Sequence, residues 1–110
     1  MLATDVAVYG DGGGKAPALA RPIFGRDQVS QVFAGWLRVI VELGLTLQPH
    51  EVNGQPGALM LDPDGRIVNA LSLDIADGLV QTIRAVSNPD KLRHLGPVGD
   101  ASALLRRHRA

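Results

Sequence analysis

The sequence predicts a small α+β domain in which a curved, antiparallel-rich sheet is wrapped around one long helix. Three observations support this class: a strongly apolar helical stretch over residues 28–43, a strand-like run before Gly10, and four strand-like runs after Leu43. The polar positions of the helical stretch recur three and four residues apart, so on a helix they form one narrow stripe. Because most of its circumference is apolar, we expect the strands to cover it on several sides.

The residues before the helix predict one strand and then a break. Residues 4–9 alternate, with valines on one side, and are rich enough in β-branched residues for a strand. The glycines of residues 10–14 end this strand, because consecutive glycines are costly inside a sheet. Asp27 either caps the helix or lies at its positive end, and Gly44 ends the helix.

After the helix, the apolar period changes to that of strands separated by short turns. The sequence Asp-Pro-Asp-Gly at residues 62–65 favours a hairpin, because proline presets one turn dihedral and glycine tolerates the other. The next run, residues 66–75, is the longest strand, and residues 76–78 form the following hairpin. Alternation places on one face of that strand Ile67, Asn69, Leu71, Leu73 and Ile75. We therefore expect a four-stranded antiparallel meander.

Length and composition exclude several classes of function. A chain of 110 residues makes one domain. Lys+Arg and Asp+Glu number 11 each, and this zero net charge argues against direct nucleic-acid binding by the whole surface. The chain has no cysteine, hence no disulfide framework or thiolate metal site, which suits a reducing cytoplasm. Nothing resembles a signal peptide or a membrane span, so we expect a cytoplasmic domain without a membrane partner.

The glycine cluster and the histidines do not form a recognisable cofactor or metal site. A phosphate-binding loop is excluded by spacing, because Tyr9 stands where its first glycine is needed and Ala16 follows Lys15. The three histidines are scattered without the short spacing of metal ligands. We expect neither a cofactor nor a metal.

Acid–base catalysis would need a carboxylate inside a pocket, with its pKa raised by apolar walls. Asp74 is the only carboxylate within a long strand, on the face opposite Leu71 and Leu73. If that face is concave, Asp74 is a candidate base; otherwise it is solvated. We favour the solvated alternative, since carboxylates near a turn usually lie outside. Tyr9, the single tyrosine, could supply a hydroxyl, but we assign no catalytic residue.

Two short motifs directly follow the first and last strands. The first, DGGGK, consists of Asp11, Gly12, Gly13, Gly14 and Lys15; the second, NPDKL, consists of Asn88, Pro89, Asp90, Lys91 and Leu92. Together with VNGQPG at residues 52–57, they resemble the C-terminal SnoaL-like domain of SigJ-type extracytoplasmic-function RNA polymerase sigma factors. The resemblance covers residues 4–95. It implies the nuclear-transport-factor-2-like cone fold that SnoaL polyketide cyclases and ketosteroid isomerases share.

The resemblance implies a regulatory, non-catalytic function. In that family the domain packs on sigma regions 2 and 4 and their linker, and it tunes how this core engages RNA polymerase and DNA. It further implies that the two motifs make these contacts, and glycines suit that role because bare backbone can approach a partner closely. The alternative is a SnoaL- or isomerase-like enzyme or a small-molecule-binding domain, which a solidly filled interior would exclude.

The chain departs from the family in two respects. It contains no sigma region 2 or 4, and the helices that open the domain are absent before Thr4. We divide it into an N-terminally truncated SnoaL-like domain, residues 1–95, and a C-terminal tail, residues 96–110. Within the tail, residues 100–109 are either a short helix capped by Asp100 or disordered. A missing helix exposes apolar surface, so we expect a homodimer; a monodisperse monomer in light scattering would contradict this.

Overall fold

The protein was analysed as a computed structural model, which describes residues 1–12, 21–52 and 54–109, without the side chains of residues 107–109. Its strands are β1 (Leu2–Asp11), β2 (Ile23–Phe24), β3 (Thr46–Pro49), β4 (Gly57–Leu61), β5 (Ile67–Ala76) and β6 (Leu79–Val86). Its helices are α1 (Arg26–Leu43), α2 (Pro89–Leu92) and α3 (Ala101–Arg109). These elements confirm the predicted α+β class.

All the described strands belong to one sheet, in the order β2-β1-β6-β5-β4-β3. The antiparallel meander from β3 to β6 is confirmed. The predicted hairpin at residues 62–65 forms, with Asp62 Oδ1 accepting the backbone N–H groups of Asp64 and Arg66 at 2.9 and 2.8 Å. The sequence did not predict that β1 lies parallel to β6, with Asp11 opposite Val86. This pairing brings the ends of the two motif-bearing strands side by side.

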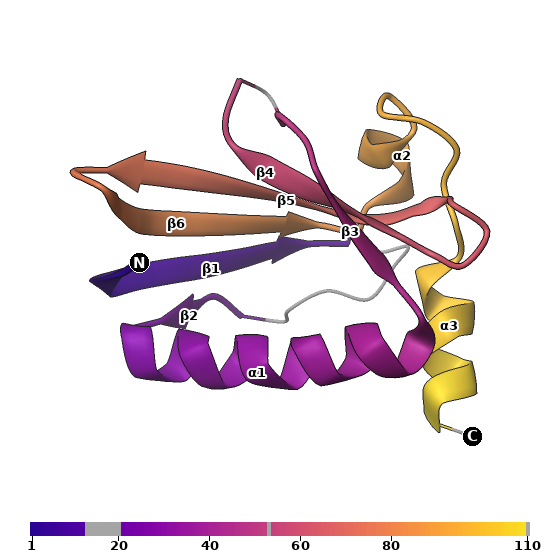
Figure 1. Cartoon of the computed structure of the whole chain (residues 1–110), viewed down its shortest axis with the longest axis horizontal. Helices are drawn as coiled ribbons and strands as arrows, with labels where there is room; N and C mark the ends of the chain where they lie inside the picture. Colours follow the sequence, from indigo (N-terminus) through magenta and orange to yellow (C-terminus); the bar gives the residue numbers. More distant parts are fainter. Residues whose placement is uncertain (13–20, 53, 110) are drawn as a thin grey trace.

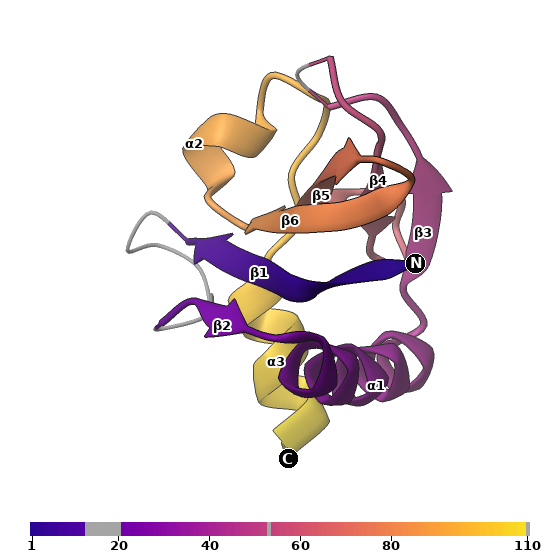
Figure 2. The same cartoon turned by 90° about the vertical axis from the view of Figure 1, so that its left-hand side faces the viewer.

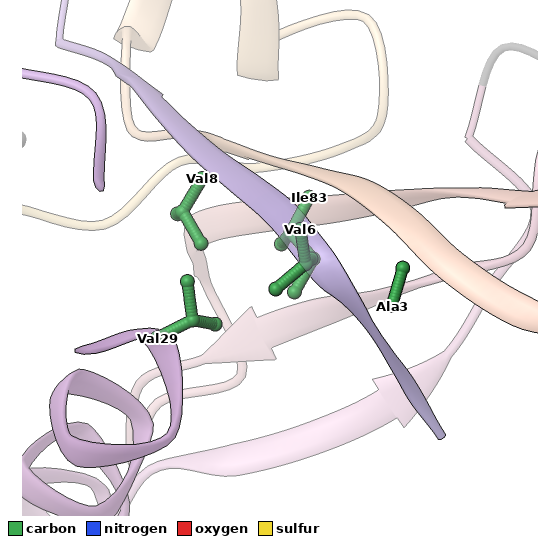
Figure 3. Packing of buried hydrophobic residues seen from close by; sticks show 5 residues of the cluster. All are labelled: Ala3, Val6, Val8, Val29 and Ile83. Atoms are coloured by element: carbon green, nitrogen blue, oxygen red, sulfur yellow. The ribbon is translucent and has the colours of Figure 1, made fainter. Parts of the chain in front are cut away.

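Helix α1 lies along one face of the sheet, on the side of β1 and β2 (Figures 1 and 2). The first half of the helix is well packed, because Val29 is buried against Val6, Val8 and Ile83 (Figure 3). Gly44 ends the helix in a left-handed conformation with φ of 69°, as predicted. At the N-terminal end, no side chain caps the helix. Asp27 therefore does not act as the cap; it lies in the first turn, at the positive end of the helix.

The expectation that the sheet encloses most of the helix is wrong for this chain. Leu37 and Val41, one helical turn apart, are 55% and 77% exposed. The strands form one open sheet whose edges, β2 and β3, do not pair with each other, so they cover α1 from one side. No helix among the described residues is long and apolar enough to cross a membrane.

Two details of the strands also differ from the prediction. Strand β1 continues through Gly10 to Asp11, because both residues pair with β6. Ile67 does not share a face with Asn69; it packs with Ala70 and Leu92 in a second buried cluster. The pairing of β4 with β5 has a register irregularity at this point, between two neighbouring residues of β4. This irregularity changes which side chains of β5 share a face.

The segment after residue 95 packs against the body of the domain. Ile67 donates its N–H to the carbonyl of Pro97, and Gly99 donates its N–H to the carbonyl of Ile67, both at 2.8 Å. The helical alternative for residues 100–109 is the one found: Asp100 Oδ1 accepts the N–H of Ala103 at 2.9 Å. Helix α3 then contacts α1 near the C-terminal end of α1 (Figure 1).

Candidate functional site

The starts of the two motifs meet at the ends of β1 and β6. The backbone carbonyl of Asp11 accepts the N–H groups of Ser87 and Asn88 at 2.8 and 3.0 Å. The ammonium group of Lys91 forms an ion pair with the carboxylate of Asp11. We call these four residues, Asp11, Ser87, Asn88 and Lys91, the motif joint.

The sequence of NPDKL explains how Lys91 reaches Asp11. Asn88 caps the short helix α2, its side-chain oxygen accepting the N–H of Asp90 at 3.1 Å, and Pro89 occupies the first turn, where no N–H is needed. Leu92 is buried beneath the turn in the second cluster and anchors it to the sheet. This leaves the charged side chains of Asp90 and Lys91 on the surface.

The motif DGGGK is described only in its first part. Asp11 is half-buried and Gly12 is buried. The other predicted contact residues of this motif, Gly13, Gly14 and Lys15, lie outside the described residues. Of the predicted partner-contact set, the structure therefore brings together Asp11, Asn88 and Lys91.

A cavity of about 280 Å³ lies directly beside the motif joint. It separates the second half of α1 from the sheet and extends to α3. Its described lining residues are Gly10, Trp36, Val39, Ile40, Leu43, Leu45, Met60, Val68, Asn69, Leu71, Ala85, Ser87, Ala101, Leu104 and Leu105. For comparison, an engineered apolar cavity of about 150 Å³ is large enough to bind benzene.

The lining is apolar apart from a few groups. Besides the indole of Trp36, the polar side chains among the described lining residues are those of Asn69 and Ser87. Asn69 Oδ1 is buried, and no donor of the described residues reaches it. Sequence reasoning placed Asn69 on the same strand face as Leu71 and Leu73 without assigning it a role. The signal was available: a lone amide among the inward-facing aliphatic residues of the longest strand.

The two weak catalytic candidates do not line this cavity. Asp74 forms an ion pair with Arg84, Nη1 to Oδ2 at 2.6 Å. The hydrogen bond from Arg84 holds the pKa of Asp74 below its usual value, against the opposing effect of desolvation and with a smaller contribution from Gln55. A carboxylate held in its ionised form by an arginine is a poor general base. Tyr9 is exposed on β1, in edge-to-face contact with Phe24 of the edge strand β2.

Within the described part of the chain there is no group of three or more histidine, aspartate or glutamate residues placed to hold a metal ion.

The fold and the site together define an α+β domain with one mixed sheet, a helix on one face and a cavity between them. This architecture is compatible with the nuclear-transport-factor-2-like cone.

The fold of this chain is similar to part of a solved structure, the crystal structure of the extracytoplasmic function sigma factor SigJ of Mycobacterium tuberculosis. The similarity has a TM-score of 0.65 and 30% sequence identity, and it covers 83% of this chain. The chain spans 35% of that sigma factor. The resemblance to SigJ-type factors, predicted from the two motifs, is thus confirmed. No protein-family model and no curated protein gives a match.

Proposed function

We propose that this chain is a regulatory, non-catalytic domain of an extracytoplasmic-function sigma factor. It modulates the activity of the sigma core in transcription initiation through contacts with regions 2 and 4 and their linker, and so acts on RNA polymerase indirectly. The similarity to SigJ supports a role connected with a sigma factor. The observation that carries the proposal is the motif joint, in which Asp11 and Lys91, 80 residues apart in sequence, form one surface.

The chemistry of the motif joint suits a docking surface. The Lys91 side chain is 62% exposed although it is paired, so a partner can reach its charge. Asp90 and Arg93 form a second ion pair at 3.1 Å on the same short helix. Charged groups at the rim of an interface mainly set specificity and the rate of association. The exposed charge of Lys91 therefore allows selection of a partner.

The experiment measures binding of this chain to a separately produced sigma core containing regions 2 and 4 and their linker. Lys91→Met removes the positive charge of the motif joint and should weaken binding by about tenfold, a loss of about 1.4 kcal/mol. The same substitution should leave the melting temperature nearly unchanged, because exposed ion pairs contribute only about 0–1 kcal/mol to stability. Calorimetric titration gives the dissociation constant, and sigma-dependent transcription in vitro gives the regulatory effect.

Arg84→Met is the matched control, because it breaks the ion pair between Arg84 and Asp74, neither of which belongs to the motif joint. Sigma-core binding should survive this substitution. Equal losses in the two variants, or no loss in Lys91→Met, would contradict the docking proposal. If Lys91→Met only unfolds the chain, the joint is structural.

The cavity favours a second function, the binding of a small molecule. The described lining contains no carboxylate, histidine or lysine, so the cavity supports a ligand site more directly than an acid–base enzyme of the cyclase or isomerase kind. Homodimerisation stays a prediction, to which the exposed Leu37 and Val41 would contribute apolar surface.

A further inference from the structure

The cavity beside the motif joint combines two features that a ligand site needs. It has a volume of about 280 Å³ with mostly apolar walls, and one buried polar atom to which no described residue donates a hydrogen bond. Buried polar groups in proteins are nearly always hydrogen-bonded, so each exception calls for a partner. Here the exception is Asn69 Oδ1, to which no described residue donates.

The ligand chemistry follows from these walls. Apolar surface is buried favourably against aliphatic and indole side chains such as Ile40, Leu71 and Trp36. A carboxamide oxygen accepts a hydrogen bond, so the complementary group is a hydroxyl or an N–H. No charged side chain is among the described lining residues to neutralise an ionised ligand. The cavity therefore fits a neutral, largely apolar molecule with one donor.

The cavity wall and the motif joint are continuous along the backbone. Gly10 lines the cavity and is followed by Asp11; Ser87 lines it and is followed by Asn88. The N–H groups of Ser87 and Asn88 both bond to the carbonyl of Asp11. A molecule that presses on the wall at Gly10 and Ser87 therefore acts on the bonds that hold the joint together.

We propose that the cavity is an effector site for a neutral, apolar small molecule carrying one hydrogen-bond donor, and that its occupancy is coupled to the ion pair of Asp11 and Lys91. The donor of the ligand bonds to Asn69 Oδ1. The coupling gives the docking surface a regulator, and this consequence rests on the function proposed above. The binding itself and the coupling are properties of this chain alone.

The first test compares two probes of nearly equal size, 4-propylphenol, which has a donor, and 4-propyltoluene, which has a methyl group in its place. Trp36 is the single tryptophan and lines the cavity, so its fluorescence, excited at a wavelength where the probes absorb little, reports binding. Calorimetric titration supplies the dissociation constants. We expect both probes to bind the unmodified chain. Failure of both to bind would overturn the effector site.

Asn69→Leu tests the hydrogen bond without adding a polar group to the cavity. The ratio of the two dissociation constants should shift against the phenol by about fivefold, the size of one neutral hydrogen bond. An unchanged ratio would overturn the role of Asn69. If Asn69→Leu fails to fold, Ala101→Leu tests instead where the probes bind. The larger side chain narrows the cavity, so both probes should bind more weakly. Unaltered binding would show that the probes bind elsewhere.

The coupling is tested by its reciprocity, without any sigma factor present. If occupancy and the ion pair are coupled, breaking the ion pair with Lys91→Met must change the dissociation constant of 4-propylphenol, by about fivefold for a typical coupling. Arg84→Met, which breaks an ion pair away from the joint, should leave it unchanged. Equal constants in all three proteins would overturn the coupling, whereas failure of the docking proposal would appear only in the sigma-core experiment.

Discussion

The two halves of the interface between α1 and the sheet have similar residues but different packing. In the first half, Val29 is buried and packs with Val6 and Val8 of β1 and with Ile83 of β6 (Figure 3). In the second half, Val39, Ile40 and Leu43 border a cavity of about 280 Å³. On the sheet side of the cavity, the walls are formed in part by Met60 of β4 and by Asn69 and Leu71 of β5. An apolar helical face therefore indicates which residues point inward, but it does not indicate whether other side chains pack against them.

The largest effect should come from making the same substitution in the two halves. Ile83→Ala, in the packed half, should lower the free energy of unfolding by roughly 3 kcal/mol, because a closely packed site collapses poorly around a new void. Ile40→Ala, on the cavity wall, should lower it by about 1 kcal/mol, because the side chain already borders empty space and is only half-buried. Urea unfolding measures both. Equal losses would show that the second half is filled.

Enlarging a side chain should have effects of opposite sign on stability in the two halves of the interface. Ala3→Leu, at a buried position of the packed cluster, should destabilise the fold by about 2 kcal/mol through overpacking. Ala101→Leu, which projects into the cavity from α3, should stabilise it by about 1 kcal/mol by filling space. Thermal unfolding followed by circular dichroism gives both signs, and destabilisation by Ala101→Leu would contradict a hollow second half.

The smallest effect on stability should come from breaking the ion pair of Asp74 and Arg84. Because these two residues do not line the cavity, this change is a baseline for the substitutions in the two halves of the interface. Arg84 lowers the pKa of Asp74 below 3.8, so the ionised carboxylate favours the folded state. This contribution is present above the unfolded pKa and is lost as the pH falls through the lowered value in the folded state.

In low salt, the urea midpoint of the unmodified chain should therefore fall more steeply below about pH 4 than that of Arg84→Met. The two proteins should show the same slope near neutral pH. A difference between them that is independent of pH would point to lost packing by the arginine stem instead of lost charge.

Local patterns were enough to predict the elements and several of their ends. The glycine at residue 44, the Asp-Pro-Asp-Gly turn and the run of four antiparallel strands depend on backbone preferences of adjacent residues, and all were confirmed. The motifs predicted the resemblance to SigJ in the same way, because order and spacing along the chain carry it. Alternation along β5 correctly grouped Asn69 with Leu71, which both line the cavity. It failed at Ile67, where a register irregularity shifts the alternation, and it did not show that Ile75 is exposed.

The candidate site was less accessible from the sequence, because it depends on distance in space. Nothing adjacent in sequence to Asp11 shows that it pairs with Lys91; that contact requires β1 and β6 to lie parallel and to end together. The amide of Asn69 could be placed on one strand face with Leu71 and Leu73, but only the tertiary structure shows that it is buried and that no described donor reaches it.

By itself the sequence determined the class of the domain, the order of its strands along the chain and the chemistry carried by its two motifs, because periodicity and turn residues act over a few neighbouring positions. Tertiary structure alone decided that the sheet stays open, that Leu37 and Val41 are left exposed, and that a cavity adjoins the motif joint. Those outcomes depend on how far an entire sheet stands from the helix it covers, and that separation is a property of all the contacts together.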